Sequence, residues 1–368
     1  MSFSAAFQSP LARATQTADV VLQGLLKHEG KALYGAQYAA WQKAPEAFEI
    51  DGHAPVRELW HRASLAWRGI LAAAPQPQAD AVPTAAAAHP TAAVADPWVA
   101  LVVAHNAINQ GLVAIALGLP PSYFRRLPQN NAALSVIQLD PAQLQPAGNG
   151  HTTTQPPVVT LVCLNQSPDN PFKNPDKVAA QVVLVSPSTA GAGEGAAAGR
   201  AALAGVLGKL RVTHVLAAPT PAATETAHAL LAGQVLPAAA AAAVDAAAAG
   251  SSGAAAVLEQ LGAAEALDPA ALWRRAVAAA GGSGAGPEHR DGGDRQYGNV
   301  VVVVDEAVHA AVLWAALGTA VPGDGGPRIR VSAGGLSVLE FAADPRVTPA
   351  AVRCVNNTAH LPPPEPAA

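Results

Sequence analysis

Two stretches of this chain repeat one design about 200 positions apart. Residues 101–118 read LVVAHNAINQGLVAIALG, and residues 301–318 read VVVVDEAVHAAVLWAALG. Each is an apolar β-branched run, a short polar break and an apolar segment closed by glycine, which is typical of a strand, a turn and a helix. At the junction of strand and helix the first copy carries His105 and the second carries Asp305. The pattern predicts a duplicated domain in which only the first copy is suited to chemistry.

Three further pairs of blocks match in the same order. They are SPLARATQTADVV (9–21) with APTPAATETAHAL (218–230), ELWHRA (58–63) with ALWRRA (271–276), and AALSVIQLD (132–140) with GGLSVLEFA (334–342). Two copies of this length are typical of two globular domains, because solenoid repeats run roughly 20–50 residues. A chain of 368 residues can bury two such cores. We expect one domain at 1–165 and a second, degenerate one at 178–362.

Strand-like runs alternate with helical patterns along the chain. The strands are expected at 98–104, 158–164, 182–185, 212–216 and 300–304. The helices are expected at 10–22, 32–43, 56–71, 107–117, 269–279 and 307–317. Short β-branched runs between helices predict an α/β fold with a largely parallel sheet. Four segments rich in Ala, Gly and Pro are expected to be loops or insertions without a site, at 72–97, 186–199, 238–253 and 281–298.

Composition excludes several classes of protein. The net charge is −4 and the basic residues are scattered, so nucleic acid is not an expected partner. No segment offers about 20 strongly apolar residues, so no membrane span is expected. The first residues show neither a secretory signal nor a transit peptide. Cys163 and Cys354 stand at matching places, VCLNQS and RCVNNT, and are expected to be unbridged thiols in a reducing compartment.

His105 is the leading candidate for a functional residue. It follows a predicted strand and precedes a predicted helix, where helix N-terminal amides favour an anion. The structural alternative is a capping or half-buried histidine. Arg13 follows a second strand-to-helix junction, FQSPLAR, and taken alone would be a solvated helix residue. Together the two predict a phosphate site, because a guanidinium binds phosphate oxygens bidentately.

A metal site is not expected. His53 and His61, with Asp51, lie on a loop and then a helix with no third ligand of the right kind close by, which favours structural roles.

Three long motifs resemble a known family. FxxxFxSPLxRAxxTA, HEGKxxYGxxxxxWQxxPxxFxIDGHxPVRELWxRA and VVxAHNAxNQxLxxxALGL resemble the histidine phosphatase (phosphoglycerate mutase-like) superfamily, and within it the chloroplast 2-carboxy-D-arabinitol-1-phosphate phosphatases. The resemblance implies tandem three-layer α/β/α domains, the first incomplete, and hydrolysis of a small phosphorylated sugar acid in the chloroplast without a cofactor. It implies that Arg13 is the phosphate-binding arginine of SPLxRA. It also implies that His105 is the family's second histidine, with Asn106 beside it at the phosphate.

The chain departs from the family at the nucleophile. None of its eleven histidines is flanked as Arg-His-Gly, so the phosphoryl-accepting histidine is expected to be absent. The family's first strand and its catalytic acid, which would follow Val21, find no match, and Ala222 stands at the Arg13 position of the second copy. Three interpretations stay open: a phosphatase inactive as written, a catalytically dead phosphate-binding or scaffold protein, or an incomplete sequence of an active enzyme. The loss of contiguous blocks favours the third. The preferred substrate and the oligomeric state are not determined.

Overall fold

The computed structural model describes part of the chain. The described residues are 5–8, 35–49, 52–74, 98–140, 158–167, 171–172, 178–187, 194–208, 210–234, 256–282 and 297–361. They divide between two compact units, one comprising residues 1–129 with 139–159 and the other residues 130–138 with 160–368. The predicted helix at 10–22 and Arg13 lie outside the described residues.

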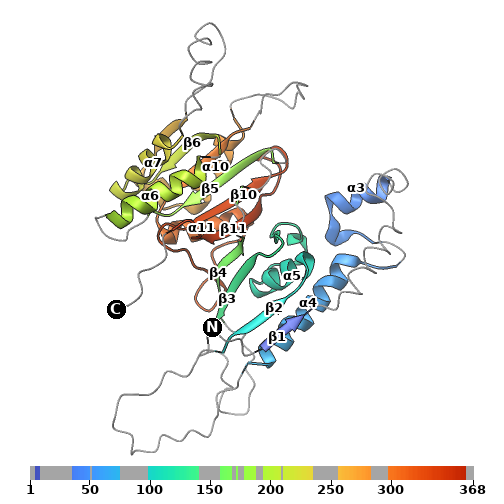
Figure 1. Cartoon of the computed structure of the whole chain (residues 1–368). Coiled ribbons are helices and arrows are strands. Elements are labelled where there is room, and N and C mark those ends of the chain that lie inside the picture. The colour runs from blue at the N-terminus through green and yellow to red at the C-terminus, as the bar shows by residue number, and fades with distance from the viewer. Residues whose placement is uncertain are drawn as a thin grey trace, which may run out of the picture. The chain divides into compact units, whose positions relative to one another are not determined.

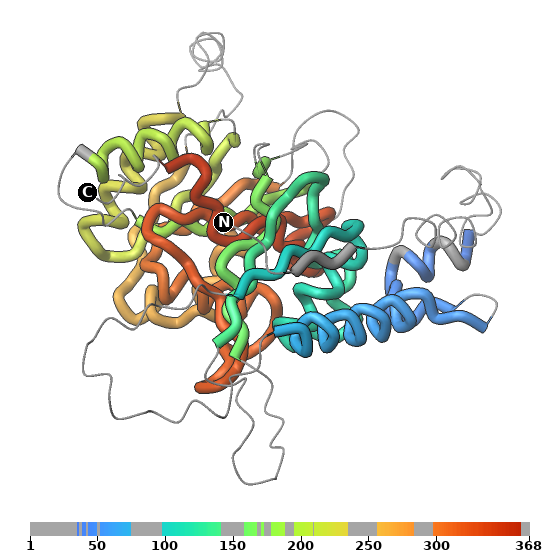
Figure 2. The backbone as a smooth tube through the Cα atoms, turned by 60° about the horizontal axis from the view of Figure 1, so that its bottom comes forward, coloured from blue at the N-terminus to red at the C-terminus, as the bar shows by residue number. Residues whose placement is uncertain are grey.

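The first unit holds a two-stranded parallel sheet and a helical layer. Its elements are β1 (Ala5–Gln8), α3 (Gly35–Lys43), η1 (Pro45–Ala47), α4 (Pro55–Ala72), β2 (Ala100–Val103), α5 (Asn106–Ala116) and η2 (Pro121–Tyr123). Helix α4 packs along α5 (Figure 2). Ala63, Ile70 and Leu112 form the buried centre of this contact. A Cβ at Gly111 would lie 3.1 Å from that of Ala63, so glycine permits the close approach of the two helices.

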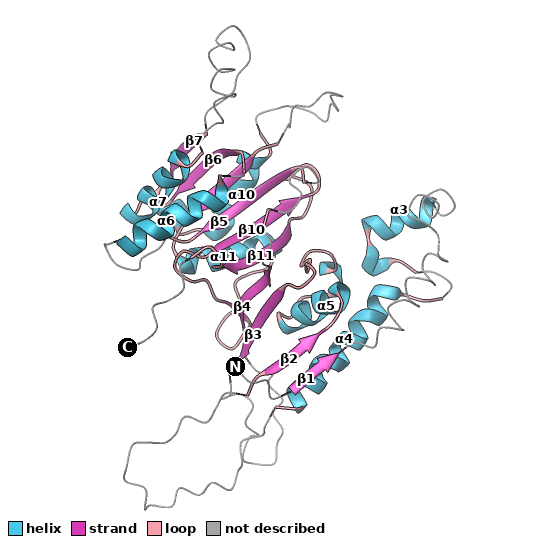
Figure 3. Cartoon of the chain, viewed as in Figure 1, coloured by secondary structure: helices cyan, strands magenta, loops and turns pink. Residues whose placement is uncertain are grey.

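The second unit is built on a nine-stranded mixed sheet (Figures 1 and 3). Its strands are β3 (Leu134–Leu139), β4 (Val159–Gln166), β5 (Ala180–Val185), β6 (Val212–Ala217), β7 (Val257–Gln260), β8 (Asn299–Val303), β9 (Arg328–Ile329), β10 (Leu336–Phe341) and β11 (Ala351–Asn357). The order is β3-β4-β11-β10-β5-β8-β6-β7, with β9 paired to β4. The chain therefore has the α/β fold that the sequence predicts.

Helices cover both faces of this sheet (Figures 1 and 3). They are α6 (Glu194–Leu207), α7 (Pro221–Ala232), α9 (Ala263–Ala266), α10 (Pro269–Ala280) and α11 (Glu306–Leu317). Helix α10 begins where Asp268 caps it, accepting bonds from the amides of Ala270 and Ala271 at 3.0 Å, with Pro269 in its first turn. Such a cap satisfies amides that have no partner within the helix.

The sheet is parallel from β5 to the edge strand β7, and antiparallel from β5 through β10 and β11 to β4. Strands β5, β6, β7 and β8 pair in parallel. Strand β10 runs antiparallel to both β5 and β11, and β11 antiparallel to β4. The prediction of a largely parallel sheet thus holds for the half of the sheet from β5 to β7 and is wrong for β10 and β11.

One predicted loop is a helix over part of its length. The segment 186–199 was expected to be a loop or insertion, but α6 begins at Glu194. Alanine has the highest helix propensity of all residues, and Leu203 and Leu207 give this helix a buried face. A scarcity of large apolar residues was therefore the wrong reason to exclude a helix.

Matching blocks of the sequence have matching backbone geometry. Gln8 pairs with Val103 between β1 and β2, and Ala217 pairs with Val303, at the corresponding positions, between β6 and β8. Left-handed backbone also recurs in pairs. These pairs are Gly118 and Gly318, Ala132 and Gly334, and Asn165 and Asn356.

Strand β5 has no counterpart in the described part of the first copy. It lies between β8 and β10, and Val303 and Leu336 of these strands are fully buried. At the matching positions Val103 is 54 % exposed and Leu134 is 56 % exposed. In the described part of the chain, β1 is the only strand that pairs with β2.

Both cysteines are free and buried, Cys163 on β4 and Cys354 on β11. Burial raises the pKa of both thiols, that of Cys354 to about 12. Neither thiol is therefore suited to act as a nucleophile near neutral pH.

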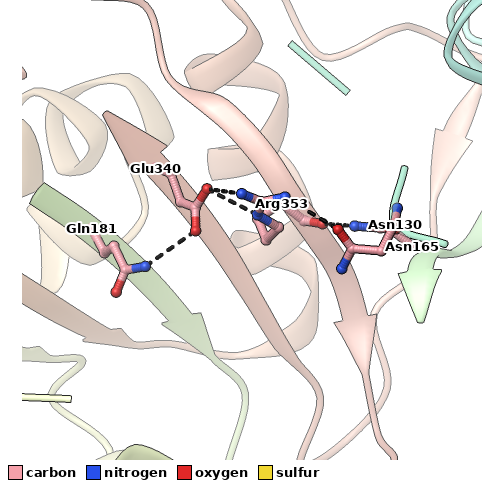
Figure 4. Close-up of polar contacts among 5 residues, drawn as sticks. All are labelled: Asn130, Asn165, Gln181, Glu340 and Arg353. Atoms are coloured by element: carbon pink, nitrogen blue, oxygen red, sulfur yellow. Dashed lines mark hydrogen bonds and ion pairs between the residues drawn. The ribbon is translucent and has the colours of Figure 1, made fainter. Parts of the chain in front are cut away.

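A partly buried chain of polar side chains crosses the antiparallel part of the sheet (Figure 4). Arg353 donates through Nε to Glu340 Oε2 at 2.9 Å and forms an ion pair with the same oxygen through Nη2 at 2.7 Å. Gln181 donates to Glu340 Oε1 at 3.2 Å, and Arg353 Nη1 donates to Asn130 Oδ1 at 3.3 Å. Glu340 is buried, so its charge depends on these partners.

Candidate functional site

His105 sits where the chain passes from β2 into α5. It has extended backbone, with φ −72° and ψ 157°, and is the residue that caps α5. Its carbonyl oxygen accepts the bond from the Asn109 amide at 3.0 Å, but its exposed imidazole makes no capping bond. The first-turn amides of α5 are thus not capped by this side chain, which leaves an N-terminus of the kind that attracts anions.

Asn106 holds a neighbouring loop against the start of α5. Its Oδ1 accepts from Gln110 Nε2 at 2.6 Å and from the amide of Gln129 at 3.0 Å. Gln110, one turn along the same helix, accepts the amide of Arg125 at 2.8 Å. The side chains of Asn106 and Gln110 therefore fix the loop 121–129 to the first turns of α5. The Asn106 side-chain oxygen thus binds the loop. That Asn106 also binds phosphate remains a prediction.

Arg125 is held in an uncommon conformation within that loop. Its φ is 72°, a left-handed value that costs a non-glycine residue roughly 1–2 kcal/mol. Its guanidinium lies over the ring of Trp41, 4.7 Å from the centroid, and 5.7 Å from that of Phe124. Nη1 also donates to the carbonyl oxygen of Trp41 at 3.4 Å. A strained residue that is held by several contacts is a feature of functional sites.

The carboxyl ends of β1 and β2 lie together. Gln8, the last residue of β1, pairs in parallel with Val103, two residues before His105. In the sequence the SPLARA block begins at Ser9, directly after Gln8, and it lies outside the described residues. Arg13 itself lies outside the described residues, so its distance from His105 is a prediction.

The corresponding position of the second copy is closed to an anion. Asp305 caps α11 with its own side chain, whose Oδ1 accepts from the Val308 amide at 2.9 Å. The carboxylate therefore occupies the place that an anion would take at a helix N-terminus, and its charge repels a phosphate.

In the second copy, three polar side chains form a buried hydrogen-bonded chain. His309 Nδ1 lies 3.0 Å from Ser186 Oγ, and its Nε2 lies 2.9 Å from Ser337 Oγ. All three side chains are fully buried, and desolvation lowers the pKa of His309 to about 3. A neutral imidazole with both nitrogens occupied inside the protein is a structural group here.

The remaining candidates make local contacts. His53 Nδ1 lies 3.1 Å from Glu58 Oε1, close to the start of α4, while Asp51 lies outside the described residues. Within the described ranges no group of three metal-ligating side chains comes together. None of the helices described for this chain is long and apolar enough to cross a membrane.

Three residues of this region were missed in the sequence analysis: Trp41, Gln110 and Arg125. Trp41 lies in the specific motif at 28–63, so a signal was present. Gln110 belongs to the AHNAxNQ motif, and its spacing of four from Asn106 places both on one helix face. Arg125 carried no signal, because its conformation and stacking exist only in the folded loop.

The chain is similar to known phosphatases. Residues 1–148 match the family model of the histidine phosphatase superfamily, branch 1. The 2-carboxy-D-arabinitol-1-phosphatase of Triticum aestivum is 36% identical over 268 residues, which cover 62% of this chain and 48% of that protein. A probable 2-carboxy-D-arabinitol-1-phosphatase of Arabidopsis thaliana is 37% identical over 209 residues, which cover 50% of this chain and 37% of that protein. The chain thus spans about half or less of the length of these relatives.

A solved mycobacterial glucosyl-3-phosphoglycerate phosphatase is also similar, with 16% identity and a TM-score of 0.28 over 48% of this chain and 99% of that one. The family model covers the β1 and β2 junctions, His105 and the loop that carries Arg125. This part of the chain, with its AHN motif and its SPLARA block, is similar to the histidine phosphatase superfamily.

Proposed function

We propose that this protein is a sugar-phosphate phosphatase whose site takes a small phosphorylated sugar acid of the 2-carboxyarabinitol 1-phosphate type. The observation that carries the proposal is His105 at an N-terminus of α5 that its side chain does not cap, next to the end of the strand that leads into SPLARA. The names of the two plant relatives support the substrate class.

The described groups supply binding and orientation. The amides of the first turn of α5 can donate to a phosphate oxygen, and the imidazole of His105 can donate to a second one. Arg13 would complete the clamp with a bidentate fork. Hydrolysis further requires a nucleophile or an activated water and an acid for the leaving oxygen.

A second candidate function is phosphate-ligand binding without turnover. It is favoured by one sequence fact: none of the eleven histidines stands in an Arg-His-Gly motif. The 368-residue chain is then expected to bind phosphate esters at His105 and Arg13 without hydrolysing them.

One comparison separates the two functions. The purified chain and its Arg13→Ala, His105→Ala double variant are incubated with 2-carboxyarabinitol 1-phosphate, and released phosphate and ligand binding are both measured. Turnover above that of the double variant supports the phosphatase. Binding that the double variant loses, without turnover, supports the binding protein. Equal binding and equal turnover by the two proteins would refute the site.

We also propose a tandem of mutase-like domains, the second of which does not bind phosphate. The matching registers of Gln8 with Val103 and of Ala217 with Val303 support the tandem, and the self-capping Asp305 supports the loss of binding. The resemblance to chloroplast phosphatases supports a chloroplast location, which a fluorescent fusion of the protein in leaf cells would test.

A further inference from the structure

We propose that Arg125 is a specificity residue that binds the carboxylate of the substrate, while His105 and the N-terminus of α5 take its phosphate. The inference rests on the proposed function and names a residue that reads the acid group. Three observations carry it: the left-handed backbone of Arg125, the aromatic ring beneath its guanidinium, and the attachment of its loop to α5.

The loop is fixed in place before any ligand arrives. Gln110 accepts the Arg125 amide at 2.8 Å, and Asn106 accepts the Gln129 amide at 3.0 Å. The hydrogen bond of 2.6 Å between Gln110 and Asn106 joins these two anchors. These bonds offset the cost of a left-handed arginine and fix where its side chain starts.

The guanidinium is oriented as well as placed. Trp41 lies under it at 4.7 Å, and the Trp41 carbonyl oxygen accepts from Nη1 at 3.4 Å. A guanidinium that stacks on a ring keeps its N–H groups in its own plane, directed past the edge of the ring. A planar carboxylate meets such a fork with two parallel hydrogen bonds. Little side-chain entropy is then lost on binding, because the arginine is already ordered.

The place where this loop is anchored suits the ligand. In a 2-carboxy sugar 1-phosphate the carboxyl group stands on the carbon next to the one that carries the phosphate. A carboxylate receptor must therefore lie close to the phosphate receptor. Asn106, which anchors the Arg125 loop, is the residue directly after His105.

Two ligands that differ only in the acid group test the proposal. The 368-residue chain is titrated calorimetrically with 2-carboxyarabinitol 1-phosphate and with arabinitol 1-phosphate. We expect the carboxylated ligand to bind roughly tenfold tighter or more, the range of one charge-assisted bidentate contact. In Arg125→Asn, which tolerates left-handed backbone, the two ligands are expected to bind within about twofold of each other.

Two variants complete the design. Arg125→Lys keeps the charge and loses the fork, so it is expected to lose most of the preference. It also decides the question if Arg125→Asn does not fold, as judged by its melting temperature. Arg68→Gln removes one exposed positive charge from α4 and is expected to change neither affinity.

The outcomes separate the two levels of the proposal. If the variants of Arg125 keep the full preference for the carboxylated ligand, the assignment of Arg125 is wrong and the phosphate site stands. If neither ligand nor inorganic phosphate binds the unmodified chain, the proposed function fails, and the role of Arg125 fails with it.

Discussion

Asn165 and Asn356 make the same set of hydrogen bonds in opposite directions across β4 and β11. Asn165 Nδ2 donates to the carbonyl oxygen of Arg353 at 2.6 Å, and Asn356 Nδ2 donates to that of Val162 at 2.9 Å. Each acceptor lies three residues before the other asparagine.

The two asparagines are also alike in backbone conformation and in the hydrogen bonds of their backbone amides. Both have left-handed backbone, with φ 55° and 51°. Asn165 donates its amide to Ser135 Oγ, and Asn356 donates its amide to Ser337 Oγ. Leu164 pairs with Val355, which are also matching positions, so a local two-fold axis relates the two strands. This arrangement supports the proposal that the chain arose by duplication.

We expect each asparagine to stabilise the fold in two ways, through the hydrogen bonds of its side chain and through its tolerance of left-handed backbone. Asn165→Gly keeps the left-handed backbone and loses the side-chain bonds, so it should lower the free energy of unfolding by about 1–3 kcal/mol. Asn165→Ala should cost roughly 1 kcal/mol more, because alanine is strained at positive φ. Urea unfolding measures both values, with Asn356→Gly and Asn356→Ala as the matched pair. Equal stability of the glycine and alanine variants would contradict the backbone argument.

The buried His309 predicts a loss of stability in acid. Its pKa is about 3 in the folded protein, against about 6.5 for an unfolded chain. Below pH 6.5 the unfolded state therefore binds one more proton, and this contribution to stability falls by about 1.4 kcal/mol per pH unit as the pH drops toward 3. His309→Asn, which places the residue of the first copy at this position, does not titrate. The free energy of unfolding, measured between pH 7 and 4, should fall less steeply with pH in the variant, by that slope. An equal fall in both proteins would exclude the role of His309.

The two strand-to-helix junctions should respond differently to alanine. Asp305→Ala removes a cap bond and is expected to cost about 0.5–2 kcal/mol of stability. His105→Ala removes an exposed side chain that makes no cap bond, so its effect should stay within about 0.5 kcal/mol. Thermal unfolding of both variants checks this contrast. A large loss of stability in His105→Ala would favour a structural role for this histidine over a ligand-binding one.

Removing one partner of the Glu340–Arg353 ion pair should destabilise the protein more than replacing both partners by apolar residues. Arg353→Met leaves the buried carboxylate of Glu340 without its cation and is expected to cost about 3 kcal/mol, the lower end of the range because Arg353 is partly exposed. Adding Glu340→Leu removes the stranded charge and should recover most of this loss. A double-mutant cycle by chemical denaturation measures the coupling. Additive losses in the double variant would show that the pair does not act as a unit.

Much of the fold follows from local sequence patterns. The strand over 300–304 and the helices over 56–71, 269–279 and 307–317 were predicted within one or two residues of their observed ends. Their apolar spacing and their caps act within a few residues of chain, which is why sequence suffices to place them. Helix α6 escaped prediction, because its Ala- and Gly-rich sequence is helical on a surface that only the folded sheet provides.

The sequence by itself predicted a duplicated design, and it determined the α/β class and the place of His105 between a strand and a helix. The tertiary structure decided what surrounds that residue. It placed Asn106 and Gln110 as anchors of a loop, gave Arg125 its left-handed backbone, and laid its guanidinium on Trp41, 84 positions away in sequence. It also buried His309 of α11 between Ser186, directly after β5, and Ser337 of β10. These relationships depend on contacts between distant segments, whose free energy is realised only when the whole core has formed, and no local pattern encodes them.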